Sequence, residues 1–175
     1  MPLPASLKSL EFGARFNQSM DNIELPDGLE CLIFGARFNQ PMDKVDLPPS
    51  LLRLSFDQEF DQRMDNVALP NGLQILEFDG HFNQSLDHVH LPDSLQSLWF
   101  GYAFNQSLDN TVLPSSLQTL IFGQRFNQSL DNTTLPSGLQ HLRFHRNYRW
   151  SLVNAAVPYG TRVYGYMGGR AYYEW

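Results

Sequence analysis

The chain lacks most of the features that mark secreted and membrane proteins. Its 175 residues contain one cysteine, Cys31, so no internal disulfide can form. No apolar run approaches the roughly 20 residues that a membrane helix needs, and we expect no membrane span. The sequence does not begin with a basic segment followed by an apolar stretch, as a secretory signal would. These absences favour a reducing, cytoplasmic compartment.

Positive charge is scarce over most of the chain. There are 12 Lys and Arg against 18 Asp and Glu, which gives a net charge of −6. Residues 1–142 carry 7 basic and 17 acidic residues, whereas residues 143–175 carry five arginines against one acidic residue, Glu174. A nucleic-acid-binding domain needs a basic footprint, so we expect no nucleic-acid partner. The difference in charge between the two ends suits packing against another protein or a second copy.

Catalytic and metal-binding motifs are also missing. Neither the pair His88 and His90 nor the pair His141 and His145 has a cysteine or carboxylate at metal-ligand spacing. No histidine accompanies Cys31 in a way that would make a Cys–His nucleophile. The sequence therefore predicts a protein that is not an enzyme and that has no metal site and no cofactor. It does not favour a small-molecule ligand either.

What the sequence does contain is a repeat with a period of 22 residues. Seven Leu-Pro pairs recur without an insertion, beginning at Leu3, Leu25, Leu47, Leu69, Leu91, Leu113 and Leu135. Seven such units fill residues 3–156. The unit reads L-P-x-S/G-L-x-x-L-x-F-G/D-x-x-F-N-Q-x-M/L-D-N-x-x, and we number its positions from the first leucine. A fixed period of this length is typical of a solenoid built from stacked coils.

Apolar residues recur at positions 1, 5, 8, 10, 14 and 18 of the unit. Positions 10 and 14 hold all 13 phenylalanines, which predicts two aromatic ladders along the stack. The alternation at the end of L-x-x-L-x-F indicates a short strand, and the rest of the unit is too short and polar for a regular helix. We therefore predict a mainly β, leucine-rich-repeat-like solenoid of seven 22-residue coils. It would have short parallel strands, turns or 3₁₀ turns on the outer side, and little or no α-helix.

Two polar columns need a structural role. Position 15 is Asn in most units, and we expect its side chain to bond the backbone of its own turn and of the next coil. Asp61 replaces this Asn in the third unit and can still accept a hydrogen bond. The Asp at position 19 suits capping of a turn through its carboxylate.

The unit L-P-x-S-L-x-x-L-x-F-G-x-x-F-N-Q closely resembles the FNIP repeat, a relative of leucine-rich repeats. The opening L-P-x-x-L-x-x-L also resembles bacterial-type leucine-rich repeats. The resemblance covers residues 3–156 and includes both the period and the F-N-Q core. It implies a curved parallel-sheet solenoid that is used for protein interactions.

The two ends of the array differ in sequence. We expect residues 1–156 to form seven FNIP-like repeats and residues 157–175 to form an altered eighth coil that acts as a C-terminal cap. Tyr164 and Tyr166 would take strand positions in that eighth coil. A solenoid needs such a cap because its hydrophobic cross-section would otherwise meet water.

The first coil has no comparable cover in the sequence. We expect Leu7 and Phe12 to be exposed beside an open strand edge, and open edges invite pairing with another chain. This uncapped N-terminal coil is one candidate site for another protein or for a second copy.

The outward-facing strand positions vary from unit to unit while the core positions stay nearly constant. At positions 9 and 12 we expect an exposed apolar cluster of Trp99, Tyr102 and Ile121, flanked by Arg143 and Arg146. Aromatic residues and arginine dominate binding energy at protein interfaces, although drift among copies also produces variation. The sequence thus predicts a protein–protein interaction module that uses its sheet face or its N-terminal coil. The alternative is a structural subunit of a larger multi-protein assembly.

Overall fold

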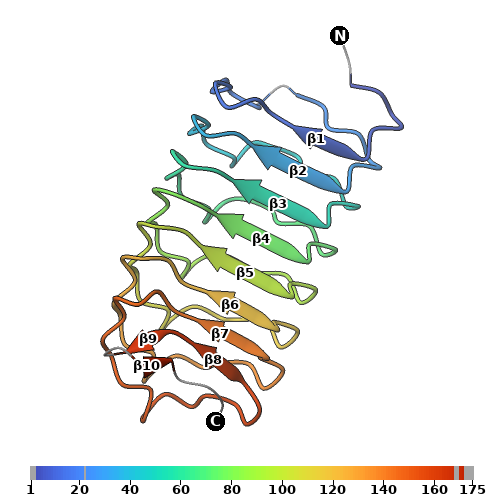
Figure 1. Cartoon of the computed structure of the whole chain (residues 1–175). Coiled ribbons are helices and arrows are strands. Elements are labelled where there is room, and N and C mark those ends of the chain that lie inside the picture. Colours follow the sequence, from blue (N-terminus) through green and yellow to red (C-terminus); the bar gives the residue numbers. More distant parts are fainter. Residues whose placement is uncertain (1–2, 22, 168–169, 172–175) are drawn as a thin grey trace.

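The computed structural model describes residues 3–21, 23–167 and 170–171, and these residues form a single stack of coils (Figure 1). Eight parallel strands lie side by side in chain order in one sheet, and two further strands form an antiparallel pair. No helix occurs among the described residues. The sheet strands are β1 (Ser9–Glu11), β2 (Cys31–Phe34), β3 (Arg53–Phe56), β4 (Ile75–Phe78), β5 (Ser97–Phe100), β6 (Thr119–Ile121), β7 (His141–Arg143) and β8 (Arg162–Tyr164). The antiparallel pair consists of β9 (Tyr166–Met167) and β10 (Arg170–Ala171).

The strand register follows the sequence repeat. Leu10 lies opposite Leu32, and the same position-8 pairing continues through every neighbouring pair up to β6 and β7. The last pair departs from it, because Leu142 lies opposite Val163, which is 21 rather than 22 residues further along the chain. The prediction of a leucine-rich-repeat-like solenoid of seven 22-residue coils with short parallel strands is therefore confirmed.

Turns connect the strand of each coil to the strand of the next coil. In the second coil, three backbone amides each bond the carbonyl three residues earlier: Leu29 to Pro26 at 3.0 Å, Phe38 to Gly35 at 3.0 Å and Val45 to Met42 at 3.1 Å. The proline at position 2 suits the first turn because it carries no amide hydrogen to satisfy. Of the two possibilities left open by the sequence, the described residues show turns and no 3₁₀ segment.

The core consists of the predicted apolar columns. In coils two to six, the side chains at positions 5, 8, 10, 14 and 18 are buried. Each coil places its two phenylalanine rings against each other, as with Phe34 and Phe38, whose centroids are 3.9 Å apart. The next ring of the same ladder, Phe56, lies 5.3 Å from Phe34 and nearly parallel to it. This spacing is close to the separation of neighbouring strands, so the strand register holds the two ladders in step.

A further buried column was not predicted from the sequence. Position 21 is buried in the second to seventh coils, where it is occupied by Val45, Val67, Val89, Thr111, Thr133 and Ala155. This position was not recognised as apolar because the column changes from valine to threonine along the chain. The threonine hydroxyls are accommodated because Thr111 and Thr133 donate to the carboxylates of Asp87 and Asp109 in the preceding coils, at 3.3 and 3.2 Å. The β-branched shape that all but alanine share was the available signal.

The position-15 column forms a ladder along the stack, as predicted. The Oδ1 atom of Asn39 accepts the backbone amide of Asp61, and Oδ1 of Asp61 accepts the backbone amide of Asn83. The glutamine at position 16 reinforces it, since Nε2 of Gln84 also donates to Asp61. The ladder contacts the next coil only, and the expected bonds within its own turn are absent among the described residues.

The role proposed for the position-19 aspartates was wrong in its chemistry. In four coils the turn at this point is capped by the serine at position 17, whose hydroxyl accepts the aspartate backbone amide. One example is Ser85 and Asp87, 3.1 Å apart, and the same contact joins Ser107 to Asp109. The carboxylates of Asp87 and Asp109 instead reach the threonines of the following coils.

Candidate interaction surface

The outer face of the sheet is built by strand alternation. Leu98 in β5 is buried in the core, so its neighbours Ser97 and Trp99 point to the opposite face. The same alternation holds in every strand of the sheet, and positions 7 and 9 therefore form two outward columns. The side chains on this face differ from coil to coil, because the core places no demand on them.

Trp99 occupies the middle of this face. Its side chain is 42% exposed, and its partners in the register are Glu77 on β4 and Ile121 on β6. Ile121 in turn lies opposite the exposed Arg143 on β7. The structure therefore brings Trp99, Ile121 and Arg143 together on three consecutive strands. Ile121 is half-buried rather than exposed, because the longer side chains of Trp99 and Arg143 flank it on both sides.

Tyr102 lies in the turn after β5 and is 43% exposed. The guanidinium carbon of Arg125, one coil further along the chain, lies 4.9 Å from the centre of its ring in a cation–π arrangement. The backbone amide of Arg125 also donates to the carbonyl of Tyr102 at 3.0 Å. Arg125 was not predicted from the sequence as a surface residue, although the arginine at position 13 recurs in the first two coils. Arg146 is exposed at the same coil position as Tyr102, two coils later.

On the β3 and β4 side of Trp99, an ion pair covers the outer face of the sheet. Nε and Nη2 of Arg53 donate to Oε2 of Glu77 at 3.0 and 2.6 Å. Glu77 is buried on the outer face because Arg53 covers it, although its position alternates away from the core. The charge of this carboxylate is thereby neutralised within the protein.

The first coil is less well covered than those that follow. Leu10 and Phe12 are half-buried, whereas Leu32 and Phe34 at the same positions of the next coil are 0% exposed. Leu7 is half-buried as well, so the prediction that Leu7 and Phe12 are exposed is met in part. Their packing against the second coil covers one side of each, and β1 pairs on one side only.

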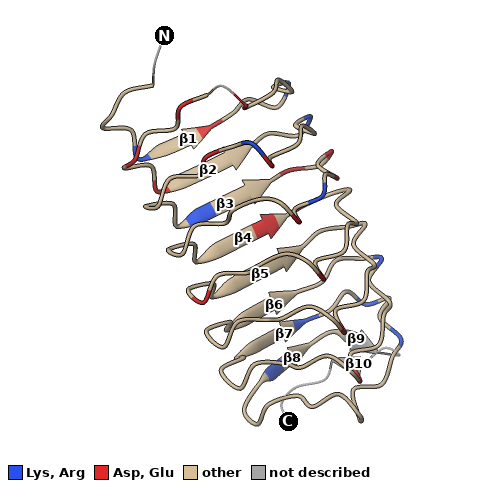
Figure 2. Ribbon diagram, turned by 180° about the vertical axis from the view of Figure 1, so that it is seen from behind, with Lys and Arg blue, Asp and Glu red and all other residues tan. Residues whose placement is uncertain are grey.

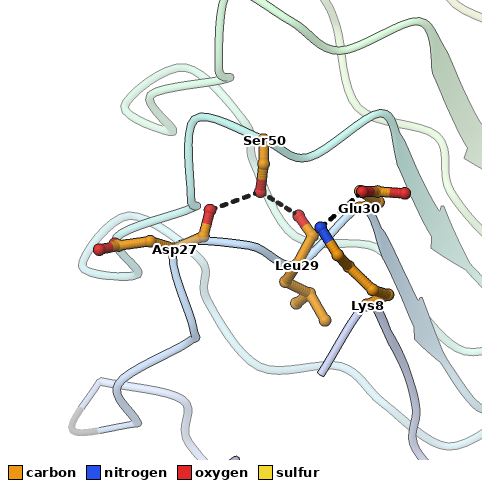
Figure 3. Close-up of polar contacts among 5 residues, drawn as sticks. All are labelled: Lys8, Asp27, Leu29, Glu30 and Ser50. Atoms are coloured by element: carbon orange, nitrogen blue, oxygen red, sulfur yellow. Dashed lines mark hydrogen bonds and ion pairs between the residues drawn. The ribbon is translucent and has the colours of Figure 1, made fainter. Parts of the chain in front are cut away.

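Polar contacts fasten the first three coils to one another (Figure 3). Nζ of Lys8 lies 2.8 Å from Oε1 of Glu30, which joins the first coil to the second across an exposed surface. The hydroxyl oxygen of Ser50 lies 2.6 Å from the carbonyl oxygens of Asp27 and Leu29, which joins the third coil to the second. The partly covered first coil is thus held in the same register as the rest of the stack.

The C-terminal end has aromatic substitutions at conserved positions of the unit. Tyr148 replaces the phenylalanine of position 14 and stacks on Phe126, with centroids 5.8 Å apart. Its hydroxyl is buried without a hydrogen-bond partner among the described residues. Burial, with a smaller contribution from Asp131, raises the pKa of Tyr148 to about 12. Trp150 replaces the glutamine of position 16, and its Nε1 donates to the carbonyl of Asn127 at 2.7 Å.

The end of the chain departs from the predicted eighth coil. Tyr164 lies in β8 opposite Arg143, as a strand residue of that coil should. Tyr166 does not belong to the eight-stranded sheet, since it pairs with Ala171 between β9 and β10. The shortened step into β8 ends the regular register, and β9 and β10 pair with each other outside the eight-stranded sheet. Part of the segment predicted as a cap, residues 168–169 and 172–175, lies outside the described residues.

Neither a metal-ligand cluster nor a membrane-spanning helix occurs in the described part of the chain. In residues 3–21, 23–167 and 170–171, no three His, Cys, Asp or Glu side chains come together as a metal site would require. The same part of the chain contains no helix of the length and apolarity that crossing a membrane demands.

These observations define a class of protein. A parallel sheet of stacked, repeated coils around ladders of leucine and phenylalanine is a solenoid of the leucine-rich-repeat type, and such solenoids generally serve as scaffolds for protein interactions. The family model of the FNIP repeat matches residues 2–36, 38–81 and 82–125, which is more than half of the chain. The chain belongs to the FNIP repeat family. The seventh coil lies outside these matches, yet β7 continues the register of the preceding strands.

A solved structure shows the same architecture. It is the crystal structure of CroV588, described as a novel circular LRR protein structure, with 38% sequence identity and a TM-score of 0.81. The similarity covers 93% of this chain and 27% of the other, so this chain spans about a quarter of the length of that protein. No curated protein matches the chain.

Proposed function

We propose that the chain is a non-enzymatic protein–protein interaction module that binds its partner through the sheet face or through the uncapped N-terminal coil. One observation carries this proposal. The core columns are nearly constant and buried, whereas the outward columns change from coil to coil and expose Trp99 and Arg143 on the sheet face, with Tyr102 exposed in the turn after β5. Folding does not require large aromatic side chains at these positions, so their presence fits a surface that contacts something else.

Trp99 is the best anchor on that face. More than a third of its side chain remains to be buried, and the half-buried Ile121 lies beside it on the neighbouring strand. Tryptophan, tyrosine and arginine are the residue types that most often dominate interface energy, and here they lie on neighbouring coils. A partner that covers Trp99 would also contact Tyr102 and Arg143.

The first coil offers a second region. Leu7 and Phe12 keep part of their surface open, and β1 has a free edge. We propose that residues 157–175 act as the cap of the opposite end, because β8 shifts the register and buries Val163. The free edge of β1 is then suited to extension by another chain.

A second candidate function is that of a structural subunit in a larger multi-protein assembly. The free edge of β1 favours it, because a further coil in the same register would complete the burial of Leu10 and Phe12. The solved structure that this chain resembles is described as a circular LRR protein, which supports continuation of such a stack beyond seven coils. In that case the sheet edge, and not Trp99, would be the essential contact.

The test compares two alanine variants. Trp99→Ala removes the proposed anchor, whereas Val112→Ala removes a side chain that is 81% exposed outside the sheet strands and serves as the matched control. Proteins captured by each variant from the cell of origin are quantified by mass spectrometry, and the fold is checked by circular dichroism. We expect Trp99→Ala to lose a partner that Val112→Ala retains. Equal capture by both variants would contradict a role for the sheet face.

The N-terminal coil needs its own measurement. Sedimentation analysis of the purified chain over a range of concentrations reports self-association, and Leu7→Lys should reduce it if the first coil is the contact. A strict monomer at high concentration, with capture that depends on Trp99 alone, would argue against the assembly function.

A further inference from the structure

The charged side chains of the sheet are unevenly distributed between its two halves. Around β1 to β4, positions 6 to 13 of the unit hold six acidic and four basic residues, so both signs of charge are present. Two ion pairs, Lys8–Glu30 and Arg53–Glu77, join some of these residues. The corresponding segments around β5 to β8, residues 96–103, 118–125, 140–147 and 161–165, contain no aspartate or glutamate. Figure 2 shows blue on β7 and β8 and no red on β5 to β8.

These four segments carry four arginines together with exposed aromatic rings. We call this surface the Arg–aromatic face; its strand residues are Trp99, Arg143 and Arg162 on β5, β7 and β8, and its turn residues are Tyr102, Arg125 and Arg146, which follow β5, β6 and β7. Tyr164 extends it, since it lies beside Arg143 in the register and is 38% exposed. All four arginines are exposed, and none forms an ion pair with any residue in the described part of the chain.

We infer that the Arg–aromatic face binds an acidic peptide segment that carries an apolar residue for Trp99. This rests on the proposed function and names the chemistry of the partner. Charge complementarity carries the inference: a cluster of arginines without carboxylates places positive potential on one end of an otherwise acidic protein. Arginine presents a planar fork that matches the carboxylate group, and the aromatic rings offer area for an aliphatic or aromatic side chain.

The size of the face fits a short segment. Its arginines lie on or just after β6, β7 and β8, and neighbouring strands are about 4.8 Å apart, so they span on the order of 10–15 Å across the sheet. An extended peptide covers that distance with about four or five residues. Two or three carboxylates in such a segment could meet arginines while a neighbouring apolar side chain covers Trp99.

A long polyanion suits the surface less well. Residues 1–95, which precede the face in the stack, carry 6 basic against 15 acidic residues and would repel a nucleic acid that extends beyond the face. A compact acidic segment gains the attraction of the arginines without meeting this repulsion. The experiment must therefore distinguish binding of RNA from binding of an acidic peptide.

The test selects linear 12-residue peptides from a random display library on the purified full chain. We expect the selected peptides to be enriched in Asp and Glu together with at least one large apolar residue. Their affinities, measured by fluorescence anisotropy, should weaken as salt is raised, because the contacts are ionic. Enrichment of neutral or basic peptides would overturn the inference, and so would a failure to enrich any peptide.

The chain provides matched control variants. Arg125, Arg37 and Arg15 all occupy position 13 of the unit and are exposed, but only Arg125 lies on the Arg–aromatic face. We expect Arg125→Glu with Arg143→Glu to weaken binding of a selected acidic peptide at least about tenfold, as for charge reversal at a complementary interface. Arg15→Glu with Arg37→Glu should change it less than about twofold. Equal losses of peptide affinity in the two double variants would show that any exposed arginine attracts the peptide, and would contradict the assignment to this face.

The remaining outcomes separate the inference from the proposed function. Binding of a 20-nucleotide oligouridine RNA more tightly than the selected peptides, with loss in the Arg125 and Arg143 variant, would assign the face to RNA and overturn the peptide inference. Trp99-dependent capture of a protein partner without selection of acidic peptides would leave the interaction function standing and refute the acidic chemistry. Absence of both would refute both.

Discussion

The Oδ1 atom of Asn105 lies 2.8 Å from the backbone nitrogen of Asn127, one coil further along the stack. The same oxygen lies 3.2 Å from Nε2 of Gln128. One side-chain oxygen therefore accepts hydrogen bonds from two donors of the next coil. The strands have ended at this point, so the backbone amide has no strand-pairing bond to make. Repeated along the stack, this contact joins neighbouring coils on the side away from the strands.

The ladder predicts a difference between two substitutions of Asn105. Asn105→Ala removes the acceptor of the Asn127 amide, while Nε2 of Gln128 keeps its bond to the backbone carbonyl of residue 105, so we expect a loss of about 1–2 kcal/mol in the free energy of unfolding. Asn105→Asp keeps the acceptor oxygen, as Asp61 does in the third coil, and should lose less than half as much. Urea denaturation followed by circular dichroism measures both. Similar losses for Ala and Asp would show that the amide nitrogen, and not the oxygen, matters.

Close stacking predicts the effect of a methyl group at position 11. A Cβ added to Gly123 would collide with the carbonyl of Gly101 in the preceding coil, and backbone atoms there cannot move aside. We expect Gly123→Ala to lower the free energy of unfolding by about 2 kcal/mol or more. Gly13 occupies the same position in the first coil, and a Cβ there would meet nothing within 4 Å. Gly13→Ala should therefore be nearly neutral, and an equal loss at both sites would contradict the packing explanation.

The buried hydroxyl of Tyr148 predicts a stabilising substitution. This hydroxyl has no hydrogen-bond partner among the described residues, whereas phenylalanine fills the same position in the six preceding coils. Tyr148→Phe should raise the free energy of unfolding by about 1 kcal/mol, because it removes an unsatisfied buried polar group. Thermal and urea denaturation at pH 7 measure the change. A destabilised variant would indicate that the hydroxyl has a partner.

The same residue predicts a dependence on alkaline pH. The pKa of Tyr148 is raised from 10.0 to about 12 in the folded protein, so between these values the unfolded chain ionises while the folded chain stays protonated. The folded state binds more protons in that range, and stability falls as pH rises from 10 towards 12. The loss should reach about 2–3 kcal/mol and be absent in Tyr148→Phe, whereas other tyrosines affect both proteins alike. Parallel curves for the two proteins above pH 10 would contradict it.

The interaction surface was predicted from the sequence in part. Variation at positions 9 and 12 identified Trp99, Tyr102, Arg143 and Arg146 as surface residues, because constant neighbours in the same strand had to face the core. Arg125 was missed, since its role depends on a contact with Tyr102 of the preceding coil. Ile121 was predicted as exposed but is half-buried, because the cover supplied by side chains on adjacent strands is a tertiary property.

The sequence by itself determined the coil. A period of 22 residues without insertions, with apolar residues at fixed positions, allows these repeated leucines and phenylalanines to be buried together by stacking equivalent positions in parallel register. The tertiary structure alone decided which contacts run between coils. Serine rather than aspartate caps the turn, threonine takes a place in the core, and β8 shifts by one residue. These outcomes depend on distances between residues about 22 positions apart in the sequence, which are set only when the coils pack together.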